Sequence, residues 1–112
     1  MTLFFSQQPS LLIASIGGRL DSVNAVEAQT SLEEKLKDHN GHLILDLSSL
    51  DYLSSAGLRA LLTAIKRVGA KNGKSVLVAT QPHIREILQI SGLDTLASVH
   101  PSVEAARAAL PA

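Results

Sequence analysis

The chain has 112 residues, of which 46% are hydrophobic and 18% are charged, so it is long and apolar enough to bury one core as a single domain over residues 1–112. Ten basic and ten acidic residues give a formal net charge of zero, which argues against a nucleic-acid binder. Cysteine is absent, which excludes disulfides, thiolate metal sites and a cysteine nucleophile.

The N-terminal part of the chain predicts two strands, over residues 3–7 and 11–16, on either side of a turn at Pro9-Ser10. Gly17-Gly18 is expected to end the second strand. A first helix, capped by Asp21 or Ser22, is then predicted to extend to about Asp38. Its buried face is expected to carry four apolar side chains at helical spacing: Val23, Val26, Leu32 and Leu36.

The rest of the chain alternates strands with helices. Short apolar runs at residues 42–47 and 75–79 predict buried strands, and a short strand is expected around Val99. Three further helices are predicted, from about Ser55 to Ala70, from Pro82 to a C-terminal Gly92, and from Pro101-Ser102 to near Leu110. This alternation predicts an α/β fold: a mixed, mostly parallel β-sheet flanked by about four α-helices, with the first strand antiparallel at an edge.

Residues that could support catalysis or bind a metal are scattered along the chain. The four histidines lack the spacing of metal ligands and are expected on the surface or in loops: His39, His42, His83 and His100. Asp46 falls in a buried strand, and Asp51 falls in the loop after it, where a turn or capping role is expected. A phosphate-binding glycine loop is absent. We therefore expect no catalytic residue, no metal and no cofactor, and predict that the protein is not an enzyme.

The N-terminus and the apolar runs of the sequence indicate the cellular location that we expect for the protein. The N-terminus, Met1-Thr2-Leu3-Phe4-Phe5-Ser6, lacks the basic flank and long apolar region of a signal peptide. The apolar runs fall short of the ~18 residues that indicate a membrane span. We expect a cytoplasmic protein without direct membrane insertion.

One segment stands out, at the junction between a predicted buried strand and the amphipathic second helix. Ser54 and Ser55 lie where this helix begins, so free backbone N–H groups and the positive end of the helix dipole gather beside them. A serine is expected to cap the helix, so that Ser55→Ala removes a capping hydroxyl at a cost of about 1 kcal/mol. Ala56 and Gly57 are small enough to allow close packing of the helix on the sheet.

Arg59 lies near the start of the same helix, one residue after Leu58 of the apolar stripe. Helical geometry therefore turns Arg59 away from the core. A cation at this end opposes the helix dipole, so the helix itself does not need it. We predict that Arg59 contacts a binding partner.

Three motifs resemble those of a known family, the STAS domains. Tyr52-Leu53-Ser54-Ser55-Ala56-Gly57-Leu58 resembles the loop that opens the second helix of these domains. Gly18-Arg19-Leu20-Asp21 resembles the family's Gly-x-Leu-Asp before the first helix, and Ile90-Ser91-Gly92-Leu93 resembles its Ser-Gly-Leu after the third. Because the motifs follow the family's order over essentially the whole chain, the protein is identified as a member of the STAS family, of the anti-sigma factor antagonist type.

This resemblance implies a partner-switching role. The unphosphorylated protein would bind an anti-sigma factor that is also a serine kinase of the GHKL type, and so free a sigma factor. Phosphorylation would end this binding until a serine phosphatase removes the phosphate. The family's acceptor falls on Ser55, which matches the serine three residues before the leucine of Gly-Leu. Ser54 is the second choice, because a serine stands here where the best-known antagonists have an aspartate. The predicted partner-binding residues are Asp21, Ser54, Ser55, Ala56, Gly57 and Arg59.

Two other functions remain open from the sequence. A STAS subunit of a membrane transport complex would bind an ATPase subunit without any phosphorylation cycle. A weak nucleotide hydrolase has less support, because neither a phosphate loop nor a catalytic constellation is present. The partner that the protein binds would separate these functions: a GHKL-type kinase or a transporter ATPase. Turnover of nucleotide by the protein alone would indicate an enzyme.

Overall fold

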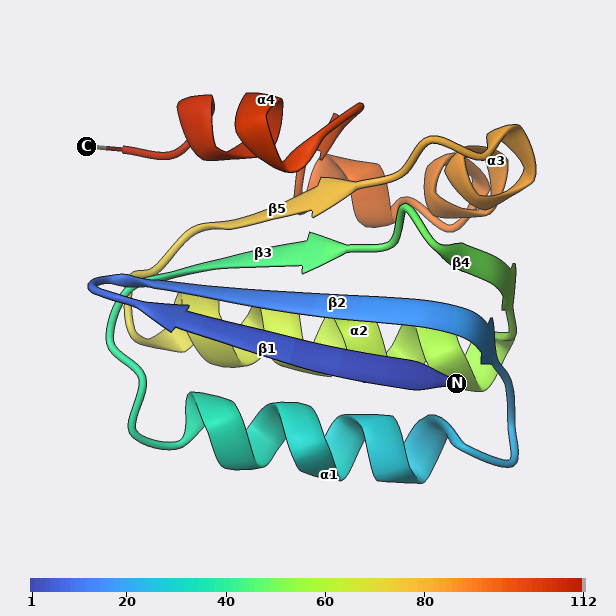
Figure 1. Ribbon diagram of the computed structural model, residues 1–112, viewed down its shortest axis with the longest axis horizontal. Helices are drawn as coiled ribbons and strands as arrows, with labels where there is room; N and C mark the ends of the chain where they lie inside the picture. Colours follow the sequence, from blue (N-terminus) through green and yellow to red (C-terminus); the bar gives the residue numbers. More distant parts are fainter. Residues whose placement is uncertain (112) are drawn as a thin grey trace.

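A computed structural model describes residues 1–111 of the chain. Strands and helices alternate along most of it (Figure 1), as predicted, and the α/β fold with a mixed, mostly parallel sheet and four α-helices is confirmed. The elements are β1 (Thr2–Gln8), β2 (Leu11–Leu20), α1 (Ala25–Leu36), β3 (His42–Asp46), β4 (Leu50–Leu53), α2 (Ser55–Ala70), β5 (Ser75–Val78), α3 (Pro82–Ile90), the 3-10 helix η1 (Leu93–Thr95), β6 (Val99–His100) and α4 (Val103–Ala108).

The sheet has the strand order β1-β2-β3-β5-β6, and β4 pairs with β2 outside this path. The edge strand β1 is antiparallel to β2, whereas β2, β3, β5 and β6 pair in parallel, both as predicted. The expected end of the second strand at Gly17-Gly18 is wrong, because β2 continues to Leu20. Gly18 has a φ of +78°, which only glycine adopts readily, and this lets the strand continue past a bend.

Strand β2 has two parallel partners. Its first half pairs with β3, from Leu11 to Ser15. Its end pairs with β4, from Gly18 to Leu20, and the register of this second pairing shifts between Gly18 and Arg19. A loop was predicted where β4 forms. Two of the four residues of β4, Asp51 and Tyr52, are exposed, so the segment lacks the apolar run that identified β3 and β5.

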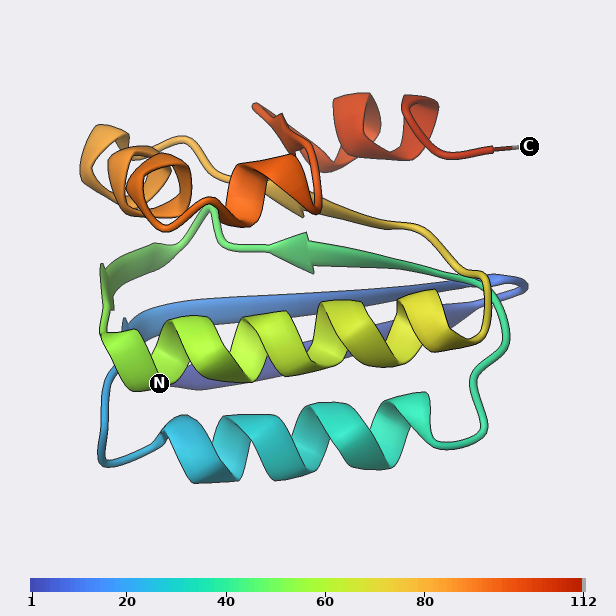
Figure 2. The same cartoon turned by 180° about the vertical axis from the view of Figure 1, so that it is seen from behind.

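Two apolar clusters cover opposite faces of the sheet. Leu12, Ala14 and Ile16 of β2 belong to the larger cluster, which α1, α2 and α3 share, whereas Leu11 and Ile13 belong to the smaller one. Because successive strand residues point to opposite faces, this alternation places the clusters on the two sides of the sheet. Helix α4 covers the smaller cluster, and Figure 2 shows α1 and α2 side by side on the other face.

The buried face of α1 differs from the predicted one. Val23 and Val26 are 88% and 73% exposed. The buried residues of the helix are Ala25, Ala28, Leu32 and Leu36. The prediction weighted large apolar side chains, but small alanines allow α1 to approach its neighbours closely. The helix also begins later than expected, because residues 22–24 form a turn.

The segment after α1 is folded inward. His39 is buried, so the expectation that it lies on the surface or in a loop exposed to solvent is wrong. Its Nε2 donates to the carbonyl of His42 at 2.9 Å, and its Nδ1 accepts from Gln7 Nε2 at 3.0 Å. The Nζ of Lys71 donates to the carbonyls of Leu36, Lys37 and His39 at 2.9–3.2 Å. These bonds satisfy free carbonyls at the C-terminal end of α1.

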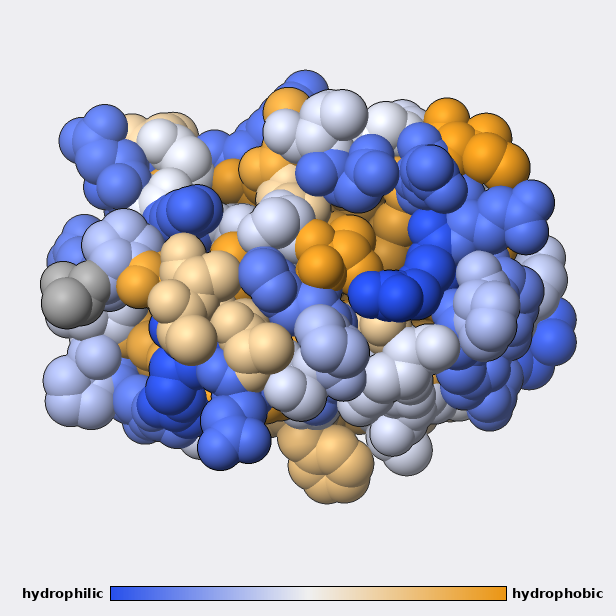
Figure 3. Space-filling view, turned by 90° about the horizontal axis from the view of Figure 1, so that it is seen from above, coloured by the Kyte–Doolittle hydropathy of each residue, from blue (hydrophilic) through white to orange (hydrophobic). Residues whose placement is uncertain are grey.

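The ends of the later helices follow the predicted signals with one difference. Pro82 is the first residue of α3, and Gly92 follows the helix with a φ of +80°, as expected for a C-terminal glycine. The last helix is shorter than predicted and ends at Ala108. Figure 3 looks down on the face that carries α3 and α4, where apolar residues form small separate groups between hydrophilic ones.

Helix α2 has the predicted bounds and packs closely on the sheet through Gly57. A Cβ atom at Gly57 would lie 2.8 Å from Leu20 Cγ, 2.9 Å from Leu53 Cδ1 and 3.0 Å from the carbonyl oxygen of Leu20. Two of these three atoms are in side chains that are themselves buried, and the third is backbone. The first turn of α2 therefore rests directly on the ends of β2 and β4.

We predict opposite effects from two glycine substitutions in α2. Gly57→Ala should lower the free energy of unfolding by about 1–3 kcal/mol, because its methyl group overpacks the contact with β2 and β4. Gly69→Ala is the matched control: a Cβ there meets nothing within 4 Å, so the change should raise stability by up to about 1 kcal/mol through helix propensity. Urea denaturation measures both. Equal stability of the two variants would contradict the close approach at Gly57.

Candidate functional site

The candidate site lies where two connecting segments meet, one from β2 to α1 and the other from β4 to α2. The two strands pair as far as Leu20 and Leu53, and the N–H of Ser54 then donates to the carbonyl of Leu20 at 2.9 Å. The carboxyl ends of the parallel strands and the N-termini of α1 and α2 therefore lie at the same end of the molecule, on the right in Figure 1. Residues that the sequence analysis singled out in two separate motifs are neighbours here.

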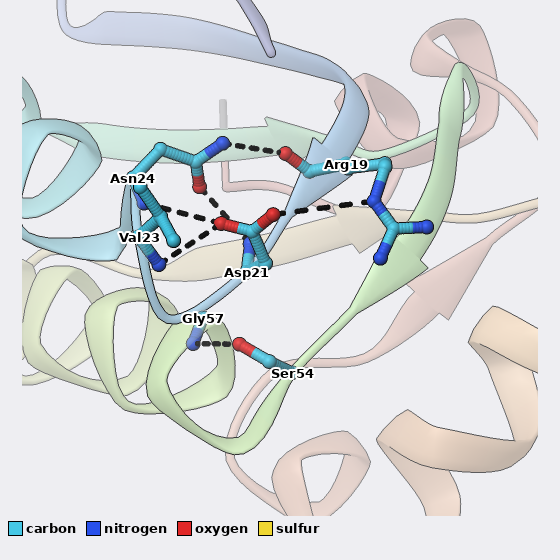
Figure 4. A network of polar contacts seen from close by, with 6 residues as sticks. All are labelled: Arg19, Asp21, Val23, Asn24, Ser54 and Gly57. Carbon is cyan, nitrogen blue, oxygen red and sulfur yellow. Dashed lines mark hydrogen bonds and ion pairs between the residues drawn. The ribbon is translucent and has the colours of Figure 1, made fainter.

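Asp21 is the centre of a polar network in the first segment (Figure 4). Its Oδ1 accepts from the N–H groups of Val23 at 3.0 Å and Asn24 at 3.2 Å. The side chain of Asn24 also bonds to Asp21, since its Oδ1 accepts from the N–H of Asp21 at 3.0 Å. Its Nδ2 donates to the carbonyl of Arg19 at 2.8 Å. The predicted helix cap at Asp21 or Ser22 is wrong, because Asn24 is the capping residue of α1. Asp21 instead stabilises the turn that precedes the helix.

Arg19 connects the two segments. Its guanidinium carbon lies 4.1 Å from the centroid of the Tyr52 ring, and its Nε lies 3.9 Å from Asp21 Oδ2. Each contact is exposed and contributes at most about 1 kcal/mol. Arg19 and Tyr52 become neighbours only through the pairing of β2 with β4. Local sequence patterns do not predict this pairing, so the contact was not expected.

Ser54 and Ser55 have different roles at the start of α2. Ser54 is the capping residue: its Oγ accepts from the N–H of Gly57 at 3.1 Å (Figure 4), and its backbone is extended. Ser55 is the first helical residue, is exposed, and has a hydroxyl without a hydrogen-bond partner within residues 1–111. The expectation that Ser55 caps the helix is therefore wrong. The hydroxyl of Ser55 is left free for other chemistry.

The remaining predicted site residues differ in their access to solvent. Arg59 is exposed, as predicted from its helical position, and Ala56 is half-buried. Gly57 is buried against the sheet and is not accessible to a partner. It can affect binding only by setting the position of the helix. Within residues 1–111 the ion pairs are Arg19–Asp21 and Arg67–Glu33, so Arg59 has no carboxylate partner in that part of the chain.

Asp51 has a different role from the expected turn or cap. It lies exposed in β4, where its Oδ1 accepts from Gln81 Nε2 at 3.2 Å and its carbonyl accepts from His83 Nε2 at 2.7 Å. These bonds attach the start of α3 to the strand that leads into the site. Asp46 is half-buried at the end of β3, and its Oδ1 accepts from the hydroxyl of Ser48 at 2.7 Å.

Among residues 1–111, no group of three or more histidine, aspartate or glutamate side chains is placed to hold a metal ion. The helices in this range are also too short or too polar to cross a membrane. The distinctive chemistry of the site is thus a free hydroxyl, Ser55, at a helix N-terminus, with a polar network and exposed cations nearby.

A family model described as the STAS domain matches residues 5–106. The chain belongs to the STAS family. This STAS protein is 38% identical over 109 residues to a Bordetella bronchiseptica protein named "Putative anti-sigma factor antagonist BtrV", covering 97% of this chain and 94% of the relative. The predicted family resemblance is confirmed.

Solved structures of other proteins share the fold. An anti-sigma factor antagonist from Mycobacterium paratuberculosis superposes with a TM-score of 0.87 at 25% identity, over 97% of this chain and 92% of the other. The Bacillus cell fate determinant SpoIIAA in its phosphorylated form superposes with a TM-score of 0.74 at 17% identity, over 96% and 98% of the two chains. The second likeness is one of fold alone.

We predict that the two adjacent serines contribute differently to stability. Ser54→Ala should lower the free energy of unfolding by about 1 kcal/mol, because the N–H of Gly57 loses its acceptor. Ser55→Ala should change it by less than about 0.5 kcal/mol, since an exposed hydroxyl without partners is removed. Chemical denaturation of both variants beside the parent protein measures the difference. A larger loss in Ser55→Ala than in Ser54→Ala would overturn the assignment of the cap.

Proposed function

We propose that this STAS protein is an anti-sigma factor antagonist, a binding module of the bacterial cytoplasm. Its unphosphorylated form binds an anti-sigma factor that is also a GHKL-type serine kinase, and a sigma factor is thereby released. The observation that carries the proposal is the exposed, unbonded hydroxyl of Ser55 at the start of α2. The 38% identity to BtrV over nearly the whole chain supports the same function.

Ser55 is the better acceptor of the two serines. A kinase must reach the hydroxyl and leave the fold intact. Ser55 is exposed and its hydroxyl bonds to no group within residues 1–111, whereas Ser54 is half-buried and its Oγ caps the helix. The kinase would transfer the γ-phosphoryl group of ATP to Ser55 Oγ, with loss of the hydroxyl proton and release of ADP. A serine phosphatase would restore the hydroxyl by hydrolysis.

A phosphate on Ser55 would change binding without unfolding the protein. It would add about −1.5 to −2 charge at a helix N-terminus, where free N–H groups and the helix dipole favour an anion. A partner that covers the site would have to desolvate this charge. A 100-fold loss of affinity corresponds to only ~2.7 kcal/mol. A dianion for which the partner offers no counter-charge is enough to produce it.

The proposed partner-binding surface surrounds Ser55. Arg59 offers an exposed cation, Ala56 is half-buried, and Asp21 is half-buried within its network. Arg19 lies beside Asp21 and over the ring of Tyr52. We therefore include Arg19 and Tyr52 in the same surface. The polar network of Asp21 and Asn24 holds this surface in one shape before any partner arrives, which lowers the entropy lost on binding.

The first test of the function is the identity of the acceptor. Incubation with a cognate GHKL-type kinase and ATP should add one phosphate to the parent protein and to Ser54→Ala, and none to Ser55→Ala. Intact-mass measurement followed by peptide mapping detects the modification. A phosphate on Ser54, with Ser55 unmodified, would show that the acceptor has been misassigned.

The second test separates the charge of the phosphate from loss of the hydroxyl. Ser55→Ala should bind the kinase partner as the parent does, because neither the cap nor the polar network is touched. Ser55→Glu should bind markedly less well, with an unchanged circular dichroism spectrum, because it places a negative charge at the interface. Calorimetric titration gives the affinities. Equal binding of the two variants would rule out the charge-switch mechanism.

A further inference from the structure

The N-terminus of α2 lacks the negative charge that helix starts favour. The first turns of α1 and α4 contain Glu27 and Glu104, whereas the first turns of α2 and α3 contain no acidic residue. The N–H groups of Ser55 and Ala56 have no acceptor within residues 1–111, since the cap of Ser54 serves Gly57. The positive end of this helix is therefore uncompensated, and the cation Arg59 follows it.

Ser55 and Arg59 are four residues apart on α2, and both are exposed. Residues at this spacing lie one above the other on a helix surface, with Cβ atoms about 5–6 Å apart. An anion that precedes a cation by four residues has the favourable orientation along the helix dipole. A phosphate on Ser55 would thus stand within reach of the Arg59 guanidinium.

The other cations near the site are less suited to hold this phosphate. Arg19 already lies over the Tyr52 ring and beside Asp21. Lys66 and Arg67 lie at least 11 residues after Ser55 on α2, which is about 16 Å along the helix axis at about 1.5 Å per residue. Arg67 also pairs with Glu33. Arg59 is the exposed cation of α2 that combines the right spacing with the absence of a carboxylate partner in the described chain.

We propose that Arg59 holds the phosphate of Ser55 within the same chain, and that phosphorylation thereby withdraws Arg59 from the partner. The inference rests on the proposed function for its biological setting. The guanidinium donates two parallel N–H groups to phosphate oxygens, a bidentate geometry that arginine provides and lysine does not. The modification then acts twice on binding, since it adds an anion to the interface and removes a cation from it.

The intramolecular contact is tested without any kinase, on the full chain with phosphoserine incorporated genetically at position 55. Titration followed by ³¹P NMR reports the second pKa of the phosphate, which is about 6 without such a neighbour. The pKa should be lower in the parent protein than in Arg59→Gln, because the nearby cation favours the dianion. Arg67→Gln, the matched control on the same helix, should titrate like the parent. Identical titration curves for the parent and Arg59→Gln would overturn the contact.

Thermal melting supplies a second measurement on the same proteins. Phosphoserine at position 55 should raise Tm in the parent and in Arg67→Gln, and most of this gain should be lost in Arg59→Gln. An undiminished gain in Arg59→Gln would assign the stabilisation to the helix dipole alone and overturn the role of Arg59. Comparison of each phosphorylated variant with its own unphosphorylated form removes any general effect of the substitution on stability.

Withdrawal of Arg59 is tested by affinity for the kinase partner. Arg59→Gln should weaken binding of the unphosphorylated protein, with a melting temperature unchanged or slightly raised, and phosphoserine should then cause a smaller fold-loss of affinity than in the parent. Unchanged affinity in Arg59→Gln would overturn the withdrawal. Absence of any binding by the unphosphorylated parent would instead refute the proposed function, while the ³¹P titration would still decide the contact.

Discussion

The bend of β2 at Gly18 is the constraint on which the site depends. Gly18 has a φ of +78°, and from Gly18 to Leu20 the strand β2 pairs with β4, after its first half has paired with β3. Within residues 1–111, β2 is the strand with which β4 pairs. This pairing brings the segment after β2 against the segment after β4, and the bond from the Ser54 N–H to the Leu20 carbonyl closes the junction.

Close packing at this junction then fixes the start of α2. Gly57 leaves no space for a side chain between the helix and Leu20, so the first turn rests on the sheet itself. The cap from Ser54 satisfies the N–H of Gly57, and the hydroxyl of the next residue is left over. The two adjacent serines thus differ: Ser54 maintains the helix, and the hydroxyl of Ser55 is left for the phosphorylation that we propose. Modification of a residue that the fold does not use is compatible with a reversible switch.

The same physical features explain why a phosphate would alter binding more than folding. A helix N-terminus favours an anion, and the start of α2 has no acidic residue of its own. The folded chain would therefore accept the added charge, whereas an apposed protein surface would have to desolvate it. If Arg59 turns to the phosphate, the chain gains an internal ion pair at the expense of one that a partner could have formed. Phosphorylation would then destabilise the complex with the partner and leave the folded chain itself stable.

The sequence by itself determined the elements with strong local patterns: the bounds of α2, the buried strands β3 and β5, and the motifs that identify the family. It did not determine β4, the buried alanine face of α1 or the burial of His39, since these depend on contacts between residues distant along the chain. Nor did it identify which serine caps α2: Ser55 was expected, but Ser54 has that role. That choice depends on where β4 ends, and β4 ends where its pairing with β2 ends, at Leu20 and Leu53. Tertiary pairing alone sets that point.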